Sequence, residues 1–148
     1  MKTAYLALGS NLGNRLENLR FAVRKLAQNG VKVAAKSKIY ASQSVESGGE
    51  GDFLNAALRV RTSLSAPQLL ALCQSIETEA GREPAVAGLH RFGARALDID
   101  ILLFDGEFWH EIELEIPHPR ALCRNFVLKP LLDVLDGGWL ETTDLSWS

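Results

Sequence analysis

Residues 97–104 show the two-residue alternation of a β-strand whose two faces differ in character. One face is entirely aliphatic, whereas the other begins with Asp98 and Asp100. Aspartate is disfavoured in strands and costly to bury unless it is paired or bound to a cation, so a core can cover only the aliphatic face. The chain must therefore contain a sheet that is buried on one side. The expected faces are Leu97, Ile99, Ile101 and Leu103 on the buried side, and Asp98, Asp100, Leu102 and Phe104 on the other.

Two explanations fit this pair of acids. Residues two apart in a strand are separated by about 6.6 Å, so Asp98 and Asp100 are spaced to bind hard cations between them. Alternatively, the strand lies exposed at the edge of a sheet and both carboxylates are solvated. The segment by itself leaves both explanations open.

The composition narrows the class of protein. The chain has 148 residues, enough for one domain (1–148) with its own core, and its net charge of −2 gives no general attraction to nucleic acid or to anionic membranes. No apolar run approaches the roughly 20 residues that cross a bilayer, and the N-terminus leads directly into a strand-like pattern without a signal peptide. Two cysteines are too few for a disulfide framework. A cytoplasmic, monomeric protein is expected.

The predicted elements follow the order strand, helix, strand, strand, helix, strand. This order matches an α+β, ferredoxin-like βαββαβ sandwich, with a mostly antiparallel sheet, two helices on one face and an active site on the other, plus a C-terminal helical segment. The strands are expected at 4–8, 31–40, 53–61, 97–104 and, less regularly, 111–116, and the helices at 12–29, 65–81 and around 128–134.

The open face of this sheet carries a second group of polar and aromatic residues. Phe53 and Asn55 lie on the face of their strand opposite Leu54 and Leu58. An aromatic ring beside an amide offers a flat heterocycle a stacking surface and a hydrogen-bonding edge. The alternative is a surface aromatic beside a turn-favouring asparagine.

Two long connections flank the open face. The stretch 41–52 is rich in serine, glycine and glutamate, which fits either a lid or a tolerated insertion. The stretch 82–95 carries Arg82, Arg91 and Arg95 and leads into the acidic strand, as expected where arginines and cations share a polyphosphate; surface ion pairs are the alternative. His118 stands between two prolines, and such a stiff segment suits a phosphate contact better than a mobile base.

Other features have ordinary interpretations. Cys73 falls on the core face of the second helix and is expected to be a small buried hydrophobe. Gln74 and Glu77 share another face of that helix and would ordinarily be solvated. Gly9-Ser10-Asn11 is either a plain turn or a set of N–H groups that binds an anion.

Taken together, these motifs resemble those of the 6-hydroxymethyl-7,8-dihydropterin pyrophosphokinase family. The resemblance runs from about Tyr5 to Leu132, and its most specific part is a Gly-x-Arg-x-Leu-Asp-x-Asp core followed by Pro-His-Pro-Arg. It implies transfer of the pyrophosphoryl group of MgATP to the hydroxymethyl oxygen of the pterin, with release of AMP, in folate biosynthesis. The matching segments are Ala7–Gly13, Phe53–Ala57, Ile76-Glu77, Gly81-Arg82, Arg91–Leu102, Pro117–Arg120 and Phe126–Leu131.

The resemblance also implies a role for individual residues. Two Mg²⁺ ions would be held by Asp98 and Asp100, which with Arg82 and Arg95 would form the catalytic set. The pterin ring would lie between Phe53 and Phe126. The implied pterin contacts are Ser42, Val45, Phe53, Asn55 and Phe126, and the implied ATP contacts are Gln74, Glu77, Arg82, Arg91, Arg95, Ile101, His118 and Arg124.

The sequence departs from the family pattern in the two loops. Gln43 and Ser44 stand where the family usually has prolines, Phe92 replaces a usual tryptophan, and Pro84 occupies a position that is often basic. These changes bear on how the loops close rather than on the type of reaction. A metal-dependent phosphoester hydrolase and a non-catalytic ligand-binding domain are the alternative functions, although the hydrolase does not account for the aromatic residues.

Overall fold

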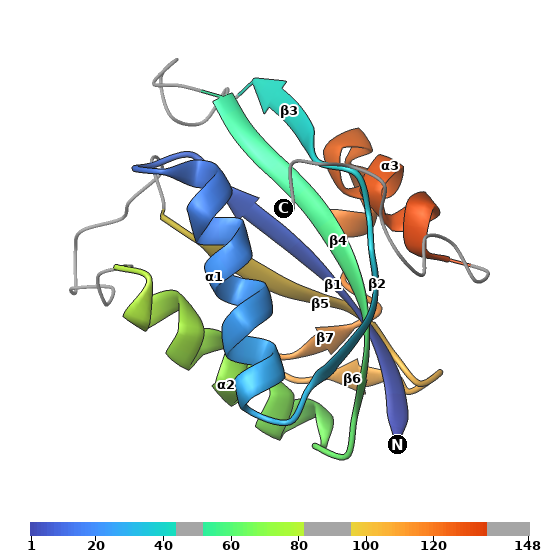
Figure 1. Ribbon diagram of the computed structural model, residues 1–148. Helices are drawn as coiled ribbons and strands as arrows, with labels where there is room; N and C mark the ends of the chain where they lie inside the picture. Colours follow the sequence, from blue (N-terminus) through green and yellow to red (C-terminus); the bar gives the residue numbers. More distant parts are fainter. Residues whose placement is uncertain (44–51, 82–95, 136–148) are drawn as a thin grey trace.

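The structure is a computed structural model that describes residues 1–43, 52–81 and 96–135. Its main sheet has the strand order β2-β4-β1-β5, with β3 pairing with β4, and every pairing is antiparallel. The predicted α+β class and βαββαβ order are confirmed (Figure 1). The elements are β1 (Lys2–Ser10), α1 (Arg15–Gln28), β2 (Lys32–Lys36), β3 (Tyr40–Gln43), β4 (Asp52–Thr62), α2 (Ala66–Glu79), β5 (Asp98–Phe104), β6 (Trp109–His110), β7 (Glu115–Ile116), η1 (Ala121–Cys123) and α3 (Asn125–Val134).

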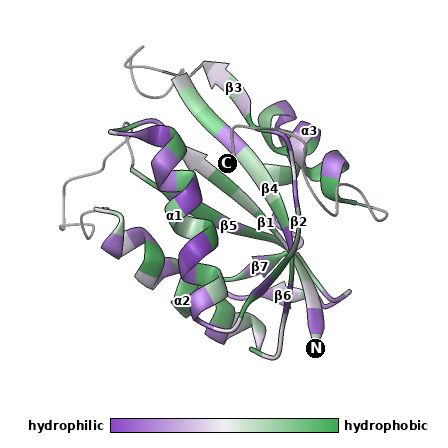
Figure 2. Cartoon of the chain, in the orientation of Figure 1, coloured by the Kyte–Doolittle hydropathy of each residue, from purple (hydrophilic) through white to green (hydrophobic). Residues whose placement is uncertain are grey.

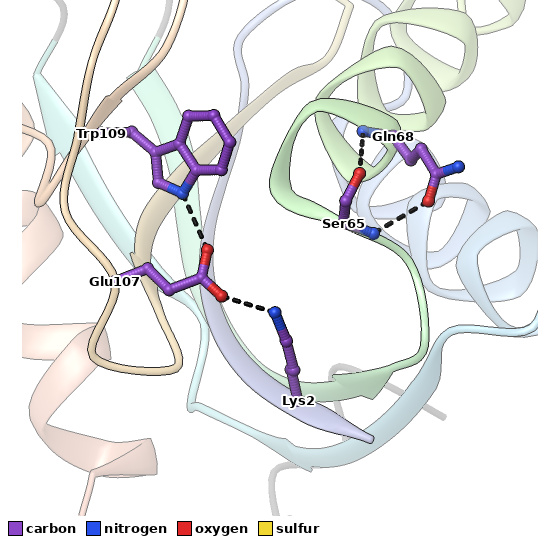
Figure 3. Close-up of polar contacts among 5 residues, drawn as sticks. All are labelled: Lys2, Ser65, Gln68, Glu107 and Trp109. Atoms are coloured by element: carbon purple, nitrogen blue, oxygen red, sulfur yellow. Dashed lines mark hydrogen bonds and ion pairs between the residues drawn. The ribbon is translucent and has the colours of Figure 1, made fainter.

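The helix α2 begins at its predicted capping box, whereas α1 begins at Arg15, three residues after the predicted start. The side chain of Asn14 accepts a hydrogen bond from the Glu17 N–H at the start of α1. Ser65 and Gln68 form a reciprocal capping box at the start of α2, which Figure 3 shows. No helix in the described part of the chain is long and apolar enough to cross a membrane.

Two hydrophobic cores lie on opposite faces of the sheet. The larger core fills the space between the sheet and helices α1 and α2, and the smaller core lies between the sheet and α3 (Figure 1). Hydrophobic residues follow the strands, while the side of α1 turned away from the sheet is largely hydrophilic (Figure 2). The second face is therefore open only in part, because apolar residues there, such as Ala57 and Leu102, are covered by α3.

The strand β5 departs from the predicted alternation at one point. Tyr5 pairs with Leu103 and Leu6 pairs with Ile101, which leaves Leu102 as an extra residue in a bulge. Beyond the bulge the faces exchange, so Leu103 packs against the smaller core and Phe104 lies in the larger one. The predicted faces are correct as far as Leu102 and wrong for the last two residues.

The predicted strand 31–40 ends at Lys36 as β2, and a second strand, β3, begins at Tyr40 and continues to Gln43 within the stretch predicted as a loop; both strands pair with β4. The chain is interrupted at Ser37, which is fully buried. Its N–H donates to the Ala57 carbonyl at 2.9 Å, and its hydroxyl accepts the Ala57 N–H at 2.8 Å. The Ser37 hydroxyl thus replaces the main-chain carbonyl that would normally accept the Ala57 N–H in a β-ladder. The main chain can therefore change direction at Ser37.

The segment after β5 forms a hairpin rather than the single strand predicted for 111–116. Only Glu115–Ile116 is extended, and it pairs with Trp109–His110. Glu107 ties the hairpin to β1, because its carboxylate lies 2.6 Å from the Lys2 ammonium and accepts the Trp109 indole N–H at 2.8 Å (Figure 3). The Lys2 hydrogen bond lowers the pKa of Glu107. In the C-terminal helical segment, Leu132 is 68% exposed.

Candidate active site

A row of residues crosses three adjacent strands on the open part of the sheet. Gly9 in β1 pairs with Asn55 of β4 on one side and with Asp98 of β5 on the other. One step along the strand, Ala7 pairs in the same way with Ala57 and Asp100. Directly paired residues in neighbouring strands point to the same face, so the amide and the carboxylates share one surface with only small residues between them.

Asn55 is held in one orientation by the strand beside it. Its side-chain amide is buried, and Nδ2 donates to the Ser42 hydroxyl at 2.7 Å. A Cβ added at Gly9 would lie 3.5 Å from Asn55 Oδ1 and 3.6 Å from Phe53 Cδ1. The amide oxygen and the edge of the ring therefore both border the space above Gly9. The sequence predicted a turn at Gly9-Ser10-Asn11, but Gly9 and Ser10 belong to β1, so Gly9 lies on the sheet surface instead.

The two aspartates occupy the more accessible side of this surface. Asp98 is half-buried and Asp100 is exposed. The Nε2 atom of His118 lies 3.9 Å from Asp100 Oδ1. The imidazole is fixed by main-chain contacts, because His118 Nδ1 accepts the Ala121 N–H at 3.1 Å and the His118 N–H donates to the Leu102 carbonyl at 3.1 Å. A tautomer with the proton on Nε2 then faces the carboxylate.

The donor set suits a hard cation. Two accessible carboxylates on one strand face offer the oxygen ligands that Mg²⁺ prefers. Within residues 1–43, 52–81 and 96–135, no group of three or more His, Cys, Asp or Glu side chains forms a metal site. Any cation held here would therefore be bound through one or two carboxylates, which is the usual arrangement for Mg²⁺ shared with phosphates.

The predicted residues of α2 separate into buried and exposed positions. Gln74 is exposed, whereas Glu77 is buried and its Oε2 accepts the Ile99 N–H at 2.8 Å. The expectation of a solvated face is therefore wrong for Glu77. Cys73 is confirmed as a buried residue; burial, with the charges of Glu77 and Asp100, raises the pKa of its thiol to about 12.

The remaining predicted contacts surround the surface from different directions. Phe126 lies in the first turn of α3, is 38% exposed, and has the Arg124 guanidinium 5.6 Å above its ring. Because α3 packs on the face that carries Asn55, Phe126 and Phe53 belong to the same side of the sheet. The side chain of Ile101 instead lies in the larger core. Only the main-chain groups of Ile101 are therefore directed along the sheet, toward β1 and toward the outer edge of β5.

Several predicted residues lie outside the described parts of the chain. They are the candidate site residues Val45, Arg82, Arg91 and Arg95, and the altered loop positions Ser44, Pro84 and Phe92. The described residues thus contain the sheet surface, His118 and the N-terminal turn of α3, and the predictions for the two long connections stay predictions.

The comparison with protein families gives a match to 7,8-dihydro-6-hydroxymethylpterin-pyrophosphokinase (HPPK) over residues 5–136. The chain belongs to this family. It is 45% identical over 132 residues to the 2-amino-4-hydroxy-6-hydroxymethyldihydropteridine pyrophosphokinase of Bacillus subtilis, an alignment that covers 88% of the chain and 77% of that relative. The enzyme of the same name from Haemophilus influenzae is 38% identical over 135 residues, covering 90% and 82%.

Other HPPK relatives are much longer proteins. The mitochondrial folate synthesis bifunctional protein of Arabidopsis thaliana is 38% identical over 142 residues, which are 96% of this chain but 25% of that protein. The folic acid synthesis protein of Pneumocystis carinii is 41% identical over 133 residues, and these amount to 17% of its length. The chain therefore spans a quarter or less of these two relatives.

Proposed function

We propose that this HPPK-family protein transfers the pyrophosphoryl group of ATP to the hydroxymethyl oxygen of 6-hydroxymethyl-7,8-dihydropterin, releasing AMP, as a step of folate biosynthesis. The observation that carries the proposal is the row Asn55, Gly9 and Asp98, which places the Asn55 amide beside a carboxylate pair on one face. Family membership supplies the identity of the two substrates.

The pterin would bind over Gly9, where the described residues provide its recognition groups. Asn55 presents a fixed amide to the polar edge of the ring, and its orientation depends on the hydrogen bond to Ser42. Phe53 and Phe126 come from the same side of the sheet and would stack on the two faces of the ring. The main chain near Val45 is a further proposed contact.

The polyphosphate of ATP would lie next to the two aspartates. Asp98 and Asp100 would hold two Mg²⁺ ions, which, when bound, neutralise the charge that develops on the phosphate oxygens. His118 is fixed beside Asp100 and would donate to a phosphate oxygen from Nε2. The proposed contacts that complete the nucleotide site are Gln74, Ile101 and Arg124 near the described surface and Arg82, Arg91 and Arg95 in the preceding connection.

In the proposed reaction, the pterin hydroxymethyl oxygen forms a bond to the β-phosphorus of ATP. The bond from that phosphorus to the α,β-bridging oxygen breaks, and AMP leaves with the bridging oxygen. The protein contributes by holding the attacking oxygen in line and by placing positive charge near the phosphates. The pterin-binding residues on β4 and the carboxylates on β5 are joined through β1, so a single rigid sheet fixes the distance between the two substrates.

The activity is tested by incubating the protein with ATP, MgCl₂ and the hydroxymethyl pterin and by following AMP and the pterin diphosphate together. Asp98→Asn and Asp100→Asn should each lower kcat/KM on the order of a hundredfold or more, with unchanged circular dichroism. Asp105→Asn is the matched control, because Asp105 lies in the turn after β5 at φ +46°, which asparagine tolerates. Release of phosphate from ATP without any pterin would indicate a hydrolase instead, and pterin binding that ignores ATP and Mg²⁺ would indicate a binding domain.

A further inference from the structure

The strand that carries the two aspartates lies at an edge of the main sheet. On one side β5 pairs with β1, through Asp98 with Gly9 and Asp100 with Ala7. On its other side no strand of the described chain pairs with it. The N–H of Ile99, the residue between the aspartates, points to that outer side and therefore needs an acceptor from another element.

Glu77 supplies this acceptor. Its Oε2 lies 2.8 Å from the Ile99 nitrogen, and the contact is buried. The contact holds the peptide unit that joins Asp98 to Ile99, one residue before Asp100. The main chain of the carboxylate pair is thus held by β1 on one side and by a helix side chain on the other.

The position of Glu77 is a costly one for a carboxylate. Glu77 is only 5% exposed and lies in the last turn of α2, where the helix dipole disfavours negative charge and where no basic residue is present. Stability by itself would favour an apolar residue here, which points to a functional reason for the carboxylate.

We propose that Glu77 is a positioning residue for Asp98 and Asp100: by replacing the missing neighbour strand, it fixes the main chain between the two carboxylates in the geometry that binds divalent cations. The inference rests on the proposed function, since it takes Asp98 and Asp100 as the cation ligands. The essential property of Glu77 is then the place of its oxygen atom rather than its charge.

Two substitutions distinguish the position of the Glu77 oxygen from the charge of its side chain. Glu77→Gln keeps an oxygen at the same reach and removes the charge, whereas Glu77→Asp keeps the charge and draws the oxygen back by about 1.5 Å. Glu79→Gln is the matched control, because Glu79 is two residues further along α2, is 48% exposed and pairs with Lys25 at the surface. All three are polar substitutions of similar size, which favours folded protein in each case.

Three readouts apply to each variant of the full chain. Hydrogen exchange of the Ile99 amide, followed by NMR, reports the contact itself. Titration of Mn²⁺ with a non-hydrolysable ATP analogue, followed by electron paramagnetic resonance, reports cation affinity without turnover. Steady-state kinetics give kcat and KM for the pterin, which binds on β4 and should keep its KM.

Glu77→Asp is expected to weaken Mn²⁺ binding by about 10- to 100-fold and to accelerate Ile99 exchange, while Glu77→Gln and Glu79→Gln stay within about threefold of wild type. The proposal is overturned if Glu77→Gln loses affinity while Glu77→Asp keeps it, which would indicate a role for charge. It is also overturned if the two variants are alike, whether both are normal or both impaired. A wild-type protein that forms no AMP would refute the proposed function, whereas exchange and Mn²⁺ binding would still decide the role of Glu77.

Discussion

Replacing Gly9 by alanine should make the protein more stable and less active. Gly9 does not have a positive φ angle, so any residue can adopt its strand conformation. An added Cβ would meet Asn55 Oδ1 at 3.5 Å and Phe53 Cδ1 at 3.6 Å, which are ordinary contact distances. The fold therefore has room for the methyl group, and the loss of backbone freedom in the unfolded chain should stabilise Gly9→Ala by about 0.4–1 kcal/mol.

The same methyl group would occupy the floor of the proposed pterin site. It would contact both the amide and the ring that are proposed to recognise the heterocycle, and it would project about 1.5 Å above the sheet. A ligand displaced by about 1 Å from its reactive position loses on the order of a hundredfold in rate. We therefore expect kcat/KM for the pterin to fall by about 10- to 100-fold, with little change in the affinity for MgATP.

The measurements are urea unfolding followed by fluorescence, pterin binding by calorimetry, and the rate of AMP formation. Gly30→Ala serves as the control, because Gly30 has φ +80° at the end of α1 and no atom within 4 Å of an added Cβ. That variant should lose about 1 kcal/mol of stability and keep its pterin affinity. If Gly9→Ala binds the pterin as tightly as wild type, the pterin does not lie over Gly9 and the assignment of the site is wrong.

Two further predictions concern the buried polar groups of the fold. Ser37→Ala removes the hydroxyl that accepts the Ala57 N–H at 2.8 Å and should destabilise the protein by about 1–3 kcal/mol in urea unfolding, because a buried donor is left without its partner; a change below 0.5 kcal/mol would contradict the account of the strand break. Ellman's reagent at pH 8 should label exposed Cys123 but not Cys73 until the protein unfolds. The pKa of Cys73 is raised from 9.0 to about 12, so the folded state keeps a proton that the unfolded state releases, and stability should fall as the pH rises through that interval.

The sequence was most informative where side chains and periodicity act locally. The capping box of Ser65 and Gln68 and the faces of residues 97–102 depend on neighbours within a few positions, and the structure confirms both. The alternation fails at Leu103 because the bulge at Leu102 is set by the pairing of β5 with β1. Such a register shift involves two distant segments, and the pattern of one strand does not contain it.

Contacts between distant elements account for the other differences. Ser37 reads as an ordinary strand residue, and only its two hydrogen bonds with Ala57 explain why the strand ends there. The face opposite α1 and α2 was expected to be open, but α3 covers the part that carries Ala57 and Leu102. The helix was predicted from its own leucines, whereas its place depends on the exposed apolar surface of a sheet that no single segment describes.

The edge position of β5 connects the accessible carboxylates with the buried one. A central strand would have a second strand along its outer side, and its polar face would be reached only from above. At the edge, Asp98 is half-buried and Asp100 is exposed, and both lie beside the proposed pterin surface, as the proposed polyphosphate site requires. The same position leaves the Ile99 N–H without a ladder partner, and a helix carboxylate, Glu77, bonds to it instead. The exposure of Asp100 and the burial of Glu77 thus accompany one feature, the absence of a paired strand beyond β5 in the part of the chain that the structure describes.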